Sequence, residues 1–134
     1  MWKNVYLINL DRRKDRLENC TKILDKYNIN FNRFSAISPN LDKINKDKLW
    51  NKSYRSFCRR DRRRRKEKYT IGALGCKMSH YYILKKAKEL NLQYVTILED
   101  DIIINEKYLE LRKEIDESVE KLINISNDWD VIYI

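Results

Sequence analysis

The sequence is poor in the residues and segments that mark several protein classes. Its 134 residues include only two glycines and one proline, which excludes collagen-like, glycine-rich and proline-rich architectures. No apolar run approaches the roughly 20 residues that cross a bilayer. The N-terminus also lacks the small-residue cleavage site of a secretory leader. We therefore expect no transmembrane segment and a cytoplasmic location, with membrane association or the endoplasmic reticulum as the alternatives.

Cysteine and histidine are scarce as well. The three cysteines, Cys20, Cys58 and Cys76, are far apart and form no CxxC pair, and His80 is the single histidine. This spacing indicates neither a disulfide framework nor a zinc site. We expect free thiols in a reducing compartment.

Basic charge is plentiful but is concentrated in one place. The net charge is +9, and residues 59–68 contribute +6 of it with eight bases and two acids. Such a run is typical of a nucleic-acid or interaction surface, or simply of a solvated segment. The aromatic residues Tyr54 and Phe57 precede the run and do not alternate with it, which weakens the case for base recognition.

Short apolar runs alternate with amphipathic stretches along the chain. Buried-strand patterns cover residues 5–10 and 94–98, residues 31–37 alternate imperfectly as a shorter strand, and residues 129–134 look like a strand. Helical periodicity covers 17–27, 75–90 and 108–122. This alternation predicts one α/β domain, a sandwich with a largely parallel sheet. The polar residues 41–68 are expected to form a basic connecting insert with short helical pieces. Because the chain stops on an apolar strand, we expect the fold to be incomplete at the C-terminus.

Three carboxylates in a row, Glu99 to Asp101, follow the strand at 94–98. Ligands of open α/β sheets bind outside the carboxyl ends of the strands, and oxygen donors there suit Mg²⁺ or Mn²⁺ on a diphosphate. The alternative is a helix cap with solvated neighbours. Receiver-like phosphotransfer domains also bind Mg²⁺ through acidic residues at strand ends. Their acidic pair usually follows the first strand, whereas here that strand is followed by Asp11 and then by arginines.

Two further motifs flank predicted helices. Asn9 to Arg16 joins the first strand to its helix, whose N-terminus attracts anions, although Asp11 could simply cap a solvated helix. Gly72 to His80 contains both glycines, which permit close backbone approach or a tightly packed helix start. His80 beside an apolar face is typical of a hydrogen-bonded core residue. No cysteine-hydrolase motif surrounds Cys76, and no GxSxG or P-loop is present.

Five stretches occur together in an order typical of one family. They are INLDRRKDRL (8–17), RFSAI (33–37), YTIGALGCKMSH (69–80), ILEDD (97–101) and DWDVIYI (128–134). The sequence thus resembles glycosyltransferase family 25, which contains bacterial lipooligosaccharide galactosyltransferases and collagen hydroxylysine galactosyltransferases. The resemblance spans nearly the whole chain apart from the basic insert.

The resemblance implies a GT-A-like nucleotide-binding fold and transfer of a hexose, most often galactose, from a UDP-sugar to a glycan or protein hydroxyl, with inversion. It implies Mn²⁺ or Mg²⁺ as cofactor, held by Glu99 and Asp101, and no nucleic-acid partner. The residues it places beside the UDP-sugar are Asn9, Asp11, Arg12, Arg16, Gly75, Ser79, His80 and Asp100. It assigns no catalytic base.

The competing hypothesis is a nucleic-acid-binding or interaction module built around Arg59 to Lys68. The abundance of Lys, Asn and Ile indicates an AT-rich genome, viral or bacterial, and does not bear on the chemistry.

Overall fold

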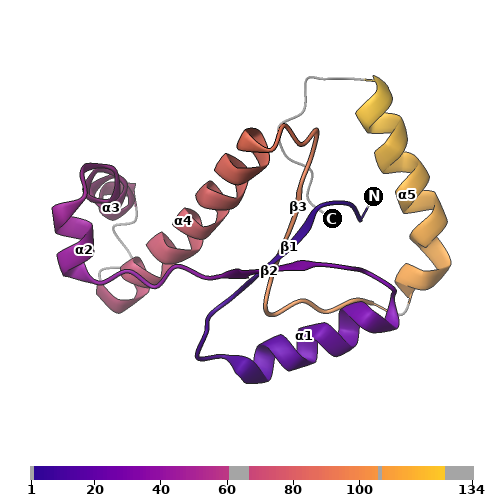
Figure 1. The fold of residues 1–134 in the computed structure, drawn as a ribbon, viewed down its shortest axis with the longest axis horizontal. Helices are drawn as coiled ribbons and strands as arrows, with labels where there is room; N and C mark the ends of the chain where they lie inside the picture. Colours follow the sequence, from indigo (N-terminus) through magenta and orange to yellow (C-terminus); the bar gives the residue numbers. More distant parts are fainter. Residues whose placement is uncertain (1, 61–66, 106, 126–134) are drawn as a thin grey trace. The chain divides into compact units, whose positions relative to one another are not determined.

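The computed structural model describes residues 2–60, 67–105 and 107–125. Contacts divide the chain into two units, one formed by Lys3–Ile102 and the other by the residues from Ile103 onward together with the first two residues. The first unit contains three strands, β1 to β3, and four helices, α1 to α4, and the second contains α5 (Figure 1). The predicted α/β class and parallel sheet are therefore confirmed.

The sheet is built around β1 (Val5–Asn9), whose five residues are all buried. β2 (Asn32–Ser35) and β3 (Thr96–Glu99) pair with it in parallel on either side, in the order β2-β1-β3. Tyr6 pairs with Asn32 on one side and with Ile97 on the other. The nearly continuous apolar run of β1 suits a central strand, since parallel sheets are covered on both faces. All three carboxyl ends consequently lie at one edge.

Helix α1 (Lys14–Lys26) follows β1 and buries Cys20 and Leu24, as its periodicity predicts. The prediction that Asp11 caps it is wrong. The residue before the first turn is Arg13, and no side chain caps the helix. The carboxylate of Asp11 accepts hydrogen bonds from β2 instead, as described below.

The insert is more helical than the sequence suggests. It contains α2 (Leu41–Lys46) and α3 (Lys48–Arg60), and α2 is capped by Asn40, whose Oδ1 accepts a hydrogen bond from the backbone N–H of Lys43 at 2.8 Å. These helices share a core with α4, formed by Ile44, Trp50, Leu74 and Met78. The expected connecting region is therefore a packed helical layer, which a few large apolar residues stabilise. Most of the basic run, residues 61–66, lies outside the described residues.

Helix α4 (Glu67–Glu89) begins before the glycines, not at Gly75. Among residues 71–89, whose burial is described, the buried ones are Leu74, Gly75, Met78, Ser79, Ile83 and Ala87. The helical periodicity predicts one apolar face formed by Cys76, Ser79, Ile83, Ala87 and Leu90. This face is confirmed from Ser79 to Ala87, whereas Cys76 and Leu90 are exposed. A Cβ on Gly75 would lie 2.3 Å from the carbonyl oxygen of Ile37. The expected close backbone approach is thus confirmed at Gly75, where α4 meets the segment that follows β2.

Helix α5 (Lys107–Ile125) confirms the third predicted helix. The predicted strand at 129–134 lies outside the described residues. None of the helices in the described ranges is both long and apolar enough to span a membrane.

We predict that Gly75→Ala destabilises the protein by about 1–3 kcal/mol, the usual cost of overpacking, because the new methyl group would collide with the backbone of Ile37. The matched control is Gly72→Ala in the same helix, where nothing lies within 4 Å. That variant should gain about 0.5–1 kcal/mol from helix propensity. Urea unfolding of both variants measures the difference, and equal stabilities would contradict the close approach.

Candidate functional site

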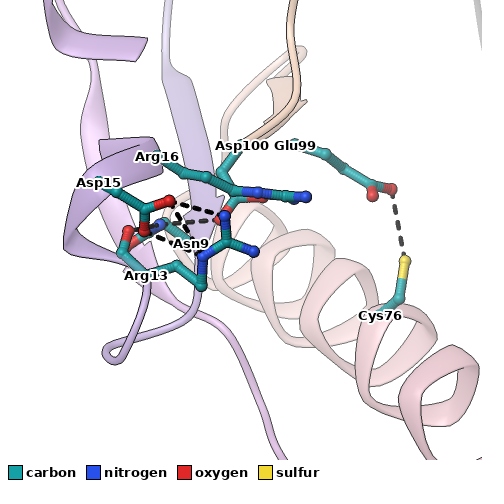
Figure 2. Close-up of polar contacts among 7 residues, drawn as sticks. All are labelled: Asn9, Arg13, Asp15, Arg16, Cys76, Glu99 and Asp100. Atoms are coloured by element: carbon teal, nitrogen blue, oxygen red, sulfur yellow. Dashed lines mark hydrogen bonds and ion pairs between the residues drawn. The ribbon is translucent and has the colours of Figure 1, made fainter. Parts of the chain in front are cut away.

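The carboxyl ends of the strands bring polar side chains together at one edge of the sheet. Asn9 ends β1, Ser35 ends β2, and Glu99 ends β3 and is followed by Asp100 and Asp101. The start of α1 lies at the same edge. The carbonyl oxygen of Arg13 accepts a hydrogen bond from the Asn9 side chain, and the Arg16 guanidinium binds Asp100 (Figure 2). This is the edge at which open α/β sheets bind their ligands.

Asp100 is the most enclosed of the three acids. Its side chain is 12% exposed and forms an ion pair with Arg16 at 2.8 Å. Its second carboxylate oxygen accepts a hydrogen bond from Asn9 Nδ2, also at 2.8 Å. The pair with Arg16 neutralises the charge of Asp100, so the net negative charge of the triplet comes from Glu99 and Asp101.

Asn9 connects this ion pair to the rest of the edge. It is 1% exposed, and its Nδ2 also donates to the carbonyl oxygen of Arg13 at 3.0 Å. Its Oδ1 accepts a hydrogen bond from Arg33 Nε at 3.2 Å. One buried amide therefore joins β1 to α1, β2 and the residue after β3, and a substitution that removed it would leave several of these polar groups unsatisfied.

Asp11 is held by β2. It accepts hydrogen bonds from Arg33 Nη2 and from Ser35 Oγ, the latter at 2.8 and 2.9 Å. The hydrogen bond from Arg33, supported by that from Ser35, holds the pKa of the Asp11 carboxyl below its ordinary value. Arg33 was not among the predicted site residues, although it begins the matching stretch RFSAI.

An open cavity of about 720 Å³ adjoins this cluster along α1. Two of the residues predicted to bind the donor, Asn9 and Asp11, line it. The other lining residues are Lys14, Leu17, Glu18, Thr21, Lys22 and Arg33. Its volume is in the range of small-molecule pockets. Of its lining bases, Lys22 is paired with Glu18 and Arg33 with Asp11, so Lys14 is the base that adds unpaired positive charge among the described lining residues. Arg12 is exposed on the loop between β1 and α1.

Glu99 points away from Asp100 and toward α4 (Figure 2). Its Oε1 accepts a hydrogen bond from the Cys76 thiol at 3.3 Å and lies 3.7 Å from His80 Nε2. Although Cys76 is exposed as a residue, partial desolvation of its sulfur, and next the hydrogen bond to Glu99, raise the pKa of the thiol to about 11. Asp101 is exposed and makes no hydrogen bond or ion pair with any described residue. The two acids predicted to hold a metal thus differ in their surroundings.

Gly75 and Ser79 connect α4 to the sheet. The Ser79 side chain is fully buried, and its hydroxyl accepts a hydrogen bond from the Ile37 N–H at 2.9 Å and donates one to the Gly75 carbonyl at 2.8 Å. The structure gives both residues a packing role, and their contact with a nucleotide stays a prediction. His80 is partly exposed, with Nδ1 3.0 Å from the carbonyl oxygen of Cys76.

Comparison with known proteins gives one consistent family. The family model described as glycosyltransferase family 25 (LPS biosynthesis protein) matches residues 2–132. A glycosyltransferase 25 family member of Aedes aegypti is 27% identical over 97% of this chain and 20% of its own length. Procollagen galactosyltransferase 1-B of Xenopus laevis is 29% identical, and procollagen galactosyltransferase 2 of Mus musculus 26% identical, over the same shares. The chain spans about a fifth of the length of these relatives.

The Arg16–Asp100 ion pair generates a prediction about stability. Arg16→Met should destabilise the protein by about 1–3 kcal/mol, because it leaves a largely buried carboxylate without its cation. The control is Lys22→Met on the same helix, whose partner Glu18 is exposed and whose loss should cost less than about 0.5 kcal/mol. Urea unfolding at pH 7 measures both, and equal losses would contradict the structural role of the pair.

The contacts of Asp11 generate a prediction about pH. A carboxyl whose pKa is lowered by folding stabilises the protein above its ordinary pKa, and this contribution is lost as the pH falls through the folded value. Arg33→Met should raise the pKa of Asp11, as followed by its side-chain ¹³C shift during an acid titration. Arg13→Met is the control: it should raise the pKa of Asp15, which Arg13 holds at about 2, and leave Asp11 unchanged. An Asp11 titration that is the same with and without Arg33 would refute the assignment.

Proposed function

Because this chain belongs to glycosyltransferase family 25, we propose that it forms the donor-binding part of a galactosyltransferase. In this proposal the donor is UDP-galactose, the acceptor is a hydroxyl of a glycan or protein, and the reaction inverts the anomeric centre. The names of the Xenopus and mouse relatives support galactose as the sugar. The observation that carries the proposal is the meeting of the acid triplet, the start of α1 and an open cavity at one sheet edge.

We assign the diphosphate of the donor to the start of α1. The first backbone N–H groups of a helix lack intrahelical partners and attract anions. Arg12, before the helix, and Lys14, at its first position, add positive charge, and Lys14 also lines the cavity. Arg16 is committed to Asp100, so its role in the proposal is to position that acid and the loop around it.

The nucleoside of the donor is assigned to the cavity along α1. Asn9 and Asp11 line it at the end of β1, and the Asp11 carboxylate is fixed by Arg33 and Ser35. A fixed carboxylate is suited to accept hydrogen bonds from sugar hydroxyls, because its orientation is set before the ligand arrives. In this arrangement Asp11 would orient the ribose.

The cation is assigned to Glu99 and Asp101, as the resemblance implies. The residues fit a hard divalent ion in part: Asp101 is exposed and has no partner among the described residues, and the Glu99 side chain is 51% exposed. Both offer the oxygen ligands that Mg²⁺ and Mn²⁺ prefer. When bound, such an ion would neutralise charge on the departing diphosphate. Asp100, paired with Arg16, would hold the two flanking acids in place without binding the ion itself.

The proposal predicts that Mn²⁺ strengthens UDP binding and that Asp101 is required for this effect. Calorimetry of the full chain should show that UDP binds at least about tenfold more tightly with Mn²⁺ than without it, a typical size for the coupling between two ligands of one protein. Asp101→Asn should abolish the increase. The matched control is Asp42→Asn on α2, another exposed aspartate, which should retain it.

Two results would contradict the proposal. UDP affinity that does not depend on Mn²⁺ in the unmodified chain would refute the metal assignment. No UDP binding under either condition would refute the donor-binding function itself.

A further inference from the structure

Three chemically different metal ligands meet where α4 passes the end of β3. Cys76 and His80 are four residues apart, so both project from the same side of α4. Glu99, at the end of β3, points to Cys76 (Figure 2), and its Oε1 also lies near His80. One ligand atom from each residue lies within 4.8 Å of the other two. The spacing of the cysteines alone does not reveal this group, because its members come from two separate segments.

The separations are close to those of a tetrahedral zinc site. With zinc bonds of about 2.0–2.3 Å to nitrogen, oxygen and sulfur, ligand atoms are separated by roughly 3.3–3.7 Å. Cys76 Sγ lies 3.3 Å from Glu99 Oε1, and His80 Nε2 lies 3.7 Å from the same oxygen. Between Cys76 and His80 the contact runs from Sγ to Nδ1, at 3.8 Å, and the three ligand atoms as a group lie within 4.8 Å of one another. Binding through Nε2 therefore needs the imidazole to move closer to the thiol.

His80 is oriented as a metal ligand usually is. Its Nδ1 lies 3.0 Å from the carbonyl oxygen of Cys76, which can only accept a hydrogen bond. A hydrogen bond donated by Nδ1 to this carbonyl leaves the ring's lone pair on Nε2, the nitrogen near Glu99; Cys76 Sγ also lies 3.8 Å from Nδ1. A backbone carbonyl that fixes the second ring nitrogen is the common support of ligating histidines.

We propose that Cys76, His80 and Glu99 bind one zinc ion, with the fourth position open to water. The thiol releases its proton to solvent and binds as the thiolate, the imidazole binds through Nε2, and Glu99 supplies one oxygen. The His80 and Glu99 side chains are 35% and 51% exposed, which leaves an approach from solvent. Sulfur and nitrogen donors favour zinc over the harder Mg²⁺ and Mn²⁺.

The site would connect α4 to the end of β3, next to the acid triplet. Zinc that binds only the folded state stabilises it. The zinc site needs neither nucleotide nor sugar, but it uses Glu99, which the proposed function assigns to the donor's cation. If Glu99 serves zinc, Asp101 is the residue on which a hard cation at the donor would chiefly depend.

Cobalt(II) provides a direct test, because a Co²⁺–thiolate bond has a charge-transfer absorption in the near ultraviolet. The full chain, kept reduced without added thiols, should bind one Co²⁺ with this band, and Zn²⁺ should remove the band by displacement. Cys76→Ser should abolish it. His80→Ala and Glu99→Gln should each weaken Co²⁺ binding by about 10–100-fold or more. Cys20→Ser and Cys58→Ser are the matched controls and should retain the band.

Thermal unfolding gives a second readout. Zn²⁺ should raise the melting temperature of the unmodified protein and of Asp101→Asn, but not that of Cys76→Ser. No thiolate band in the unmodified chain, or a band that survives Cys76→Ser, would overturn the zinc site. The proposed function is tested separately, by UDP binding with Mn²⁺ and by the effect of Asp101→Asn on it.

Discussion

The arrangement at the sheet edge depends on how one nearly buried carboxylate is neutralised. Asp100 follows β3 with most of its side chain removed from water, and Arg16 and Asn9 supply its ion pair and hydrogen bond. A buried carboxylate without such partners is strongly unfavourable. The pair therefore ties α1 to the end of β3, while Asn9 ties both to β1. Through Asn9 the same network also reaches Arg33 on β2.

This constraint also separates the three acids of the triplet by role. The middle acid is paired with Arg16 and has a structural role, whereas neither neighbour is paired with a lysine or arginine in the described part of the chain. Glu99 is near a thiol and an imidazole on α4, whereas Asp101 is exposed. Three adjacent carboxylates repel one another when all are free. Pairing one with arginine and placing another beside a hydrogen-bond donor reduces that repulsion and leaves two acids with different chemical surroundings.

β1, β3, α1 and α5 could be predicted from sequence because their apolar runs or periodicity are clear, and the common edge followed from the parallel arrangement. β2 has one apolar residue, Phe34, and is mostly exposed, so only an imperfect alternation marks it. For the insert the sequence predicts short helical pieces but not the packed layer of α2 and α3, since these helices are highly charged and a few residues such as Trp50 provide the packing. Asp11 looked like a helix cap because it precedes α1, but its partners, Arg33 and Ser35, lie on a strand more than 20 residues away. The grouping of Cys76 and His80 with Glu99 also depends on tertiary structure.

A crystal structure of this chain with UDP and Mn²⁺, with the metal located by its anomalous scattering, would test the proposed donor site at atomic detail. We expect a manganese peak within bonding distance of the Asp101 carboxylate and of the diphosphate, with the diphosphate at the start of α1. A nucleotide bound away from this edge, or a manganese ion with no contact to Asp101, would contradict the proposed site.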